Sequence, residues 1–194
     1  QQAVEFPRPY VKWSIEPARA EDVPLAIARA YHVAMTPPCG PVFVSIPLDD
    51  WEKECRPVAP RPVQRVIRGD AVLIDRLGAA LDRARAPAFV VGGQISRERA
   101  FAEIVALAER HQAGVWETPM WNRPGFPQDH PLFQGFLIAS RQNIRDDLAG
   151  HDLIVAIGAP LFTYHVEGSG PHAPPGAEVF QIIDDPDVAS WCPV

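Results

Sequence analysis

The stretch Leu153-Ile154-Val155-Ala156-Ile157-Gly158 holds five consecutive apolar residues and stops at a glycine. A run this long without polar alternation predicts a strand that is buried on both faces of a sheet. The same form is seen in Ala88-Phe89-Val90-Val91, which ends at Gly92-Gly93. A third strand is predicted at Val115-Trp116-Glu117-Thr118, before a long proline-rich loop. Buried strands of this kind are typical of parallel sheets.

Helical patterns alternate with these strands. In chain order the first is a helix that Asp70 can cap and that carries Leu73, Leu77 and Leu81 at i, i+4 spacing. The second is a helix opened by Ser96 with Ile104, Leu107 and Ala108 inward, and the third is a short helix at 140–148. A last strand is predicted at 178–183. This alternation implies an α/β fold with a Rossmann-like, doubly wound, mainly parallel sheet. Ligands of such sheets sit beyond the carboxyl ends of the strands, so the loops after Val91, Thr118 and Ile157 are the places for a site.

The part before this domain has a different organisation. Glu21, Asp22 and Pro24 predict a helix start, and Val23, Ile27, Ala30, Tyr31 and Ala34 follow at helical spacing. A buried strand is predicted at 42–46. Prolines alternate with arginines over about 52–67, where neither a helix interior nor a central strand can form. We therefore expect a partial α/β segment at 1–51, a linker at 52–67 and the doubly wound domain at 68–194.

Composition excludes several classes of protein. The chain has 194 residues, 47% of them hydrophobic, and a net charge of -6, which argues against a nucleic-acid partner. It has no 18-residue apolar run, so no transmembrane helix is expected. Cys39, Cys55 and Cys192 form no CxxC pair, so neither a zinc site nor a disulfide framework is expected, and free thiols fit a cytoplasmic protein. The chain starts Gln1-Gln2-Ala3 without a leader, and both ends suggest a piece of a longer protein.

Two loops could carry binding chemistry. Gly92-Gly93-Gln94 lies between a strand and a helix, as a phosphate-binding turn does, although the spacing is not GxGxxG and a plain tight turn is the simpler interpretation. Asp184-Asp185-Pro186-Asp187 follows the last strand and could bind a cation or a ribose hydroxyl, or form a solvated Asp-Pro turn. Neither pattern establishes a cofactor-binding or metal-binding residue.

His165 is the best single catalytic candidate. It lies on the loop beyond Gly158, at the ligand end of the predicted sheet, and histidine exchanges protons near neutral pH. A structural histidine is the alternative. Gly168-Ser169-Gly170 with His172 nearby is not a GxSxG elbow, so a serine nucleophile is not expected.

Several stretches together resemble the thiamine-diphosphate-dependent enzymes, and among them the benzoylformate decarboxylases. They are Phe6-Pro7-Arg8-Pro9-Tyr10-Val11-Lys12-Trp13-Ser14, Gly40 to Trp51, Ala86-Pro87 to Gly93, Asp129 to Gly135, and Asp152 to Gly158. The branch is indicated by Gly158-Ala159-Pro160-Leu161-Phe162-Thr163-Tyr164-His165, which is similar to a decarboxylase stretch ending in Tyr-His. Acetolactate synthases tend to carry an Arg-Phe-Asp-Asp-Arg type run there instead.

The resemblance implies that 1–51 ends the pyrimidine-binding domain, that 68–194 is most of the central domain, and that His165 reaches the active site. The full-length enzyme would use thiamine diphosphate and Mg²⁺ to convert a 2-keto acid to an aldehyde and carbon dioxide, as a homo-oligomer, dimer or tetramer. The Gly-Asp-Gly motif that holds the diphosphate is not present, since the only Gly-Asp pair is Gly69-Asp70, so the fragment alone is expected to bind no cofactor and to be inactive.

Two alternatives stay open. One is a carboligase like the acetolactate synthases. The other is a module without catalysis, which binds a nucleotide or holds subunits together, as the central domain of some relatives binds FAD or ADP. Nucleotide binding would support the module, and the loop at His165 separates the two enzyme branches.

Overall fold

The computed structural model describes residues 3–166 and 168–193. The chain divides into two units, residues 1–68 and 69–194. We describe each unit by itself. Residues 52–67 form neither helix nor strand beyond a short turn at their start, and nearly all of them are exposed. Whether this segment acts as a linker stays a prediction that proteolysis can test.

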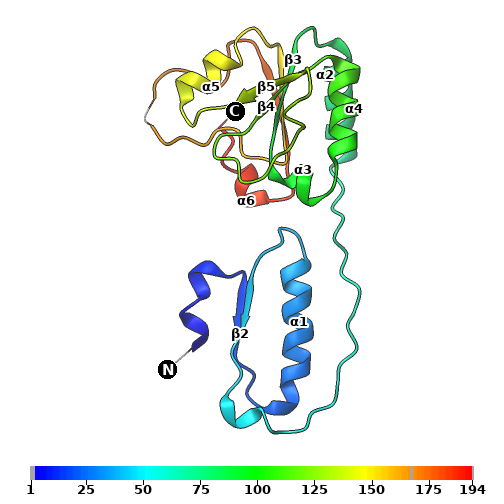
Figure 1. Cartoon of the computed structure of the whole chain (residues 1–194), viewed down its shortest axis with the longest axis vertical. Coiled ribbons are helices and arrows are strands. Elements are labelled where there is room, and N and C mark those ends of the chain that lie inside the picture. Colours follow the sequence, from blue (N-terminus) through cyan, green and yellow to red (C-terminus); the bar gives the residue numbers. More distant parts are fainter. Residues whose placement is uncertain (1–2, 167, 194) are drawn as a thin grey trace. The chain divides into compact units, whose positions relative to one another are not determined.

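Unit 1 is a small α/β segment (Figure 1). Its elements are the short 3-10 helices η1 Ala3–Glu5, η2 Arg8–Tyr10, η3 Ala20–Asp22 and η4 Leu48–Asp50, the strands β1 Trp13–Ile15 and β2 Val42–Val44, and the helix α1 Val23–Met35. The two strands pair in parallel. Lys12 fixes the end of α1, because its Nζ donates to the carbonyl oxygens of Thr36 and Pro38 at 2.6 and 3.0 Å.

The sequence predicted α1 and a buried strand at 42–46. The strand β2 ends at Val44 and none of its residues is buried, so that part of the prediction was wrong. The three-residue strand β1 was not predicted. The helical pattern in α1 does not mark a buried face throughout. Ala26 and Ala30 are buried, whereas Ile27 and Tyr31 are 51% and 54% exposed. Two strands are too few to cover both sides of the helix, so the larger apolar side chains of this unit face outward.

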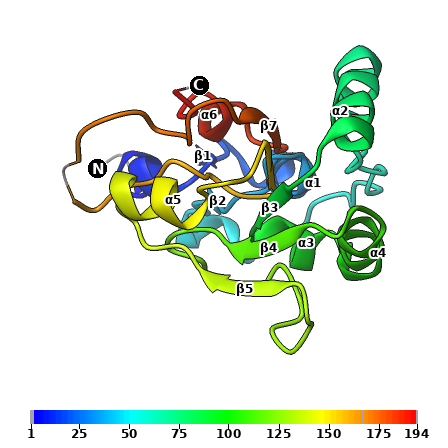
Figure 2. The ribbon, with the colours of Figure 1, turned by 90° about the horizontal axis from the view of Figure 1, so that it is seen from above.

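Unit 2 is built on one five-stranded sheet, as Figures 1 and 2 show. The strands are β3 Pro87–Val91, β4 Gly114–Glu117, β5 Phe133–Phe136, β6 Leu153–Ile157 and β7 Glu178–Ile182. Their order is β5-β4-β3-β6-β7, and every neighbouring pair is parallel. The chain first adds strands on one side of β3 and then on the other, so the switch point lies between β3 and β6. The predicted parallel α/β fold is confirmed.

Helices cover both faces of this sheet (Figures 1 and 2). They are α2 Ala71–Arg83, α3 Gly93–Arg97, α4 Phe101–His111 and α5 Arg141–Asp147, whereas the short helix α6 Pro186–Ala189 follows β7 and has no buried residue. One core contains Leu81 of α2 and Ile104 of α4 with Phe89 of the central strand, and the other contains Ile144 of α5 with Val90. Alternate residues of β3 therefore enter opposite cores, which explains why its sequence is apolar throughout.

Three details of the sequence prediction were wrong. The helix expected to open at Ser96 is two helices, α3 and α4, because Arg99 between them has a left-handed φ of 58° and ends the first run. Ser96 lies inside α3. The strand β5 and the helix α6 were not predicted. β5 is short, contains Gly135 at φ 125° and pairs with β4 through a register shift, so its sequence carries little strand signal.

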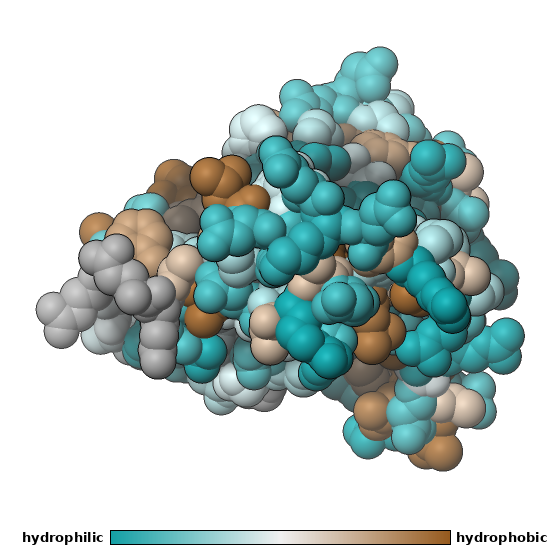
Figure 3. Space-filling view, turned by 90° about the horizontal axis from the view of Figure 1, so that it is seen from below, coloured by the Kyte–Doolittle hydropathy of each residue, from teal (hydrophilic) through white to brown (hydrophobic). Residues whose placement is uncertain are grey.

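The surface is mixed in polarity. Figure 3 shows one face on which hydrophilic residues predominate, broken by several separate hydrophobic areas. In the part of the chain that the structure describes, no helix combines the length and the apolar character that crossing a membrane requires.

Candidate functional site

A pocket of about 520 Å³ opens at the carboxyl ends of the strands of unit 2. It lies at the switch point, since residues that follow β3, β4, β6 and β7 line it. They include Gln94 and Arg97, the run from Thr118 to Arg123, Gly158 to Pro160 with Thr163, and Asp185 with Trp191. The three loops that the sequence singled out thus meet at one pocket, as expected for a doubly wound sheet.

The turn at Gly92 lies beside this pocket, and the two residues after it, Gly93 and Gln94, line the pocket. A Cβ at Gly92 would lie 2.5 Å from the Ala159 Cβ, so only glycine fits there. The amides of Gly92 and Gln94 donate to the carbonyl oxygens of Ile157 and Gly158, at 3.2 and 3.3 Å. These donors join the ends of β3 and β6, which supports the tight-turn interpretation over a phosphate cradle.

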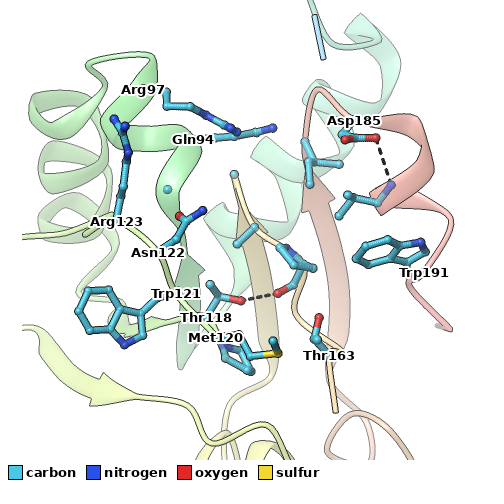
Figure 4. A pocket seen from close by; sticks show the side chains of 17 residues that line it. Gln94, Arg97, Thr118, Met120, Trp121, Asn122, Arg123, Thr163, Asp185 and Trp191 are labelled. Atoms are coloured by element: carbon cyan, nitrogen blue, oxygen red, sulfur yellow. Dashed lines mark hydrogen bonds between the residues drawn. The ribbon is translucent and has the colours of Figure 1, made fainter. Parts of the chain in front are cut away.

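Charged and aromatic side chains face each other across the pocket (Figure 4). Arg97 and Arg123 lie on the side of α3, whereas Asp185 and Trp191 lie on the side of α6. The floor is fixed by a hydrogen bond from the Thr118 hydroxyl to the Pro160 carbonyl oxygen. Such a pocket can take a polar molecule with an anionic and an aromatic part.

The acidic run after β7 is used within the protein. The Asp185 carboxylate caps α6, because it accepts hydrogen bonds from the amides of Asp187 and Val188 at 3.0 and 3.3 Å. The Asp184 carboxylate accepts from the Gln94 side chain. The segment is therefore a capped helix start and not only an Asp-Pro turn. Across residues 3–166 and 168–193, no group of three or more His, Cys, Asp or Glu side chains could hold a metal ion.

Glu117, at the end of β4, is a buried carboxyl group that sequence reasoning did not single out. Its side chain is fully buried. Its Oε1 accepts hydrogen bonds from the amides of Gly125 and Phe126 at 2.6 and 3.3 Å, while its Oε2 is buried with no partner among the described residues. Burial raises the pKa of Glu117, and the two amide hydrogen bonds oppose this rise. Glu117 thereby holds the loop that forms one wall of the pocket.

His165 lies outside the lining of the pocket, on an exposed part of the loop that follows β6. Its amide donates to the Ala139 carbonyl oxygen at 2.8 Å. The next residue, Val166, forms a parallel bridge with Ser140. The His165 imidazole is therefore carried on a backbone that is attached to the segment before α5, with its side chain open to solvent in this unit.

His172 and Ser169 do not form a nucleophile and base. Ser169 is exposed on the glycine-rich loop. The His172 Nδ1 instead makes a 2.7 Å hydrogen bond with the Tyr164 hydroxyl. Burial lowers the pKa of His172, and the charge of Arg141 lowers it further. The arrangement supports the expectation that no serine nucleophile is present.

The family follows from comparison with known proteins. The family model described as "Thiamine pyrophosphate enzyme, central domain" matches residues 74–191. The chain belongs to the thiamine pyrophosphate enzymes. The match covers the whole sheet of unit 2 and the loop of His165, and it confirms the family to which the sequence was compared.

Several thiamine pyrophosphate enzymes are similar to nearly the whole chain. Benzoylformate decarboxylase of Pseudomonas aeruginosa is 39% identical over 99% of the chain, which spans 37% of that protein. An acetolactate synthase of Arthrospira platensis is 31% identical over 92% of the chain and is covered over 32% of its length. The resemblance to the decarboxylase branch is therefore the stronger of the two, as the stretch ending at His165 predicted.

Solved structures of thiamine pyrophosphate enzymes have the same fold. The crystal structure of benzoylformate decarboxylase from Polynucleobacter necessarius is 43% identical and superposes with a TM-score of 0.94, covering 99% of the chain and 36% of its own. The 4-hydroxybenzoylformate decarboxylase of Rhodococcus jostii is 39% identical with a TM-score of 0.93, over 100% of the chain and 38% of its own. The chain spans a little over one third of the length of these relatives.

Proposed function

We propose that the full-length protein containing this chain is a thiamine-diphosphate-dependent decarboxylase of aryl 2-keto acids, which releases an aldehyde and carbon dioxide. The observation that carries the proposal is the 39% identity to a benzoylformate decarboxylase over 99% of the chain. Within that protein, residues 1–51 would end the pyrimidine-binding domain, 52–67 would be the linker and 68–194 would form most of the central domain.

Thiamine diphosphate would supply the electron sink for loss of carbon dioxide in this reaction. The described residues do not fit a site for its diphosphate and magnesium, because the carboxylates of Asp184 and Asp185 are engaged within the protein and no acidic cluster is available. The cofactor and Mg²⁺ would therefore bind elsewhere in the full-length enzyme. The chain alone would bind neither and would be inactive.

His165 is the residue of this chain that we propose to be catalytic. Its imidazole is exposed on a loop beyond the carboxyl end of β6, free to meet a substrate held by other domains. It would give and take protons at the substrate atoms that change charge during the reaction. We also propose a cytoplasmic homo-oligomer, a dimer or tetramer, with a 2-keto acid as substrate and no nucleic-acid or membrane partner.

The test is substitution of His165 in the full-length enzyme loaded with thiamine diphosphate and Mg²⁺. His165→Ala should lower kcat for benzoylformate by at least about tenfold, because a positioned proton donor contributes about 10²- to 10⁴-fold. Its thiamine diphosphate affinity should stay unchanged. His111→Ala, on the last turn of α4 across the sheet, is the matched control and should keep full activity. Unchanged turnover of every 2-keto acid by His165→Ala would show that His165 is structural.

A second candidate function is binding of a nucleotide at the switch-point pocket. The observation that favours it is the pairing of Arg97 and Arg123 on one side with Trp191 on the other, in a pocket of about 520 Å³. Calorimetry of the chain with ADP and with FAD tests it. Micromolar binding that is lost in Arg97→Ala would favour the nucleotide-binding module, and acetolactate formation from pyruvate by the full-length protein would favour a carboligase.

A further inference from the structure

The loop that carries His165 is closed by a pair of side chains. Tyr164 lies just before His165, and His172 lies at the end of the described segment 168–172. The Tyr164 hydroxyl is 2.7 Å from the His172 Nδ1. Their rings are 5.7 Å apart and inclined by 31°. Phe162 also packs edge-on against the imidazole, at 5.9 Å and 81°. The half-buried His172 thus contacts two aromatic rings.

The surroundings favour the uncharged forms of both partners in this hydrogen bond. Burial raises the pKa of Tyr164, against the opposing effect of Arg141, so the hydroxyl keeps its proton at neutral pH. Burial and the Arg141 charge lower the pKa of His172, so its ring is neutral and can accept. The Nδ1 of a neutral His172 accepts from the Tyr164 hydroxyl in one tautomer and donates to it in the other, so the two side chains form the hydrogen bond in either case.

Arg141, the first residue of α5, contacts this part of the loop. Its Cζ lies 5.4 Å from the centre of the Tyr164 ring, and its Nη1 donates to the Gly170 carbonyl oxygen at 3.3 Å. Its Nε is buried without a partner among the described residues. Burying an unmatched donor is unfavourable, and the contacts to Tyr164 and Gly170 offset that cost. Arg141 thus touches both ends of the loop.

The backbone on either side of His165 is held as well. The His165 amide donates to Ala139 at 2.8 Å, and Val166 bridges to Ser140. Tyr164, immediately before His165, is fixed by its ring and by its hydroxyl. The backbone position of His165 is therefore set by neighbours that are each tied to the domain.

We propose that Tyr164 and His172, seated on Arg141, form a clasp that positions His165 for proton transfer. The clasp residues are positioning residues, since they act on His165 by holding the backbone of its loop. The proposal rests on the function proposed above for His165. It adds His172, to which the sequence analysis assigned no role.

The first test is a double-mutant cycle in the full-length enzyme loaded with thiamine diphosphate and Mg²⁺. Tyr164→Phe and His172→Ala should each lower kcat for benzoylformate by about threefold to tenfold, the range expected for loss of one hydrogen bond that fixes a geometry. The double variant should be no slower than the slower single variant, because both changes remove the same contact. KM and thiamine diphosphate affinity should stay unchanged. Multiplicative effects of the two substitutions would overturn the clasp.

A conservative variant separates hydrogen bonding from packing. The amide oxygen of asparagine can occupy the place of the imidazole Nδ1, so His172→Asn should recover most of the lost kcat. A His172→Asn enzyme as slow as His172→Ala would overturn the hydrogen bond as the cause. His111→Ala, on the opposite face of the sheet, is the control for loss of a histidine.

Hydrogen exchange tests the clasp without relying on activity. In the full-length enzyme, peptides covering 163–172 should exchange faster in Tyr164→Phe and His172→Ala than in the wild type, and peptides of β6 should not change. Unchanged exchange of 163–172 in both variants would overturn the proposal. A wild-type enzyme that turns over no 2-keto acid would instead overturn the proposed function, and the exchange result would still decide whether the clasp exists.

Discussion

At the scale of single residues, Glu117 shows how one buried carboxyl group can make the stability of the fold depend on pH. Its Oε1 serves two amides of the pocket loop, while its Oε2 has no partner among the described residues. Burial raises its folded-state pKa above the value in the unfolded chain. The contribution of protonated Glu117 to the free energy of unfolding is then fully present below the pKa of glutamate in the unfolded chain, about 4.3. It is lost as pH rises through the pKa of Glu117 in the folded protein.

Glu117→Gln should therefore become relatively more stable than the wild type as pH rises from about 4.3 to neutrality. Glutamine keeps an oxygen for the amides of Gly125 and Phe126 but cannot ionise. The measurement is the thermal unfolding midpoint of the chain at several pH values. Glu103→Gln, exposed on α4, is the control and should follow the wild type. A constant difference between Glu117→Gln and wild type over this range would contradict the assignment.

Glu117→Ala should behave differently from Glu117→Gln. It removes the acceptor of both amides and leaves a void in the core, so it should lower the free energy of unfolding by about 1–3 kcal/mol or more at every pH. Quenching of pocket-wall tryptophan Trp121 by acrylamide should also increase. Equal stability of the alanine and glutamine variants would show that the two hydrogen bonds contribute nothing.

Sequence reasoning missed Glu117 for a physical reason. Its partners are amides of Gly125 and Phe126, which the proline-rich loop brings back over the end of β4. No spacing rule relates a strand glutamate to a loop of that shape. The contact of His172 with Tyr164 was missed in the same way, because it depends on the path of an irregular loop.

At the scale of the element, α2 begins where its capping residue predicts. Asp70 caps it as predicted, accepting hydrogen bonds from the amides of Val72 and Leu73 at 2.8 and 3.2 Å. Asp70→Ala should lower the free energy of unfolding of unit 2 by about 1 kcal/mol. Asp75→Ala, exposed in the middle of the same helix, should have little effect. Urea unfolding compares the two, and equal effects would contradict the capping role.

Elements with strong local signals were predictable and those without were not. The buried strands β3 and β6 and the capped helix α2 carry continuous apolar runs or a cap, and the structure has them within a residue or two of the expected bounds. β5 is placed by pairing with β4, and α6 by the Asp185 cap after a proline. Long-range pairing and a four-residue helix leave little trace in a local pattern.

At the scale of the whole molecule, the chain should be cut first between its two units. Trypsin should cleave the full chain after Lys53, Arg65 and Arg68, whereas Arg56 and Arg61 precede prolines and should resist. The expected products, identified by mass spectrometry, begin near Glu54, Val66 or Gly69. The arginines of α2 and α4 are the internal control. First cuts inside 70–157 would contradict the predicted linker.

The place of the pocket was also predictable at this scale. Parallel order alone puts the loops after β3, β4 and β6 at one edge, and the pocket lies there. Which side chains line it was not predictable, because Arg97 depends on the break between α3 and α4, and Trp191 depends on α6. The order of the strands predicts where the pocket lies, whereas irregular local structure decides which side chains line it.

The tryptophans offer an optical readout of unit 2. Trp116 is 9% exposed in the core beside α5, with His151 edge-on at 5.0 Å, whereas Trp121 and Trp191 are 45% and 58% exposed at the pocket. Emission from a buried indole is blue-shifted relative to one in water. A single-tryptophan protein that keeps Trp116 should therefore report melting of the core by a red shift, while one that keeps Trp191 should respond to occupancy of the pocket with no melting at all.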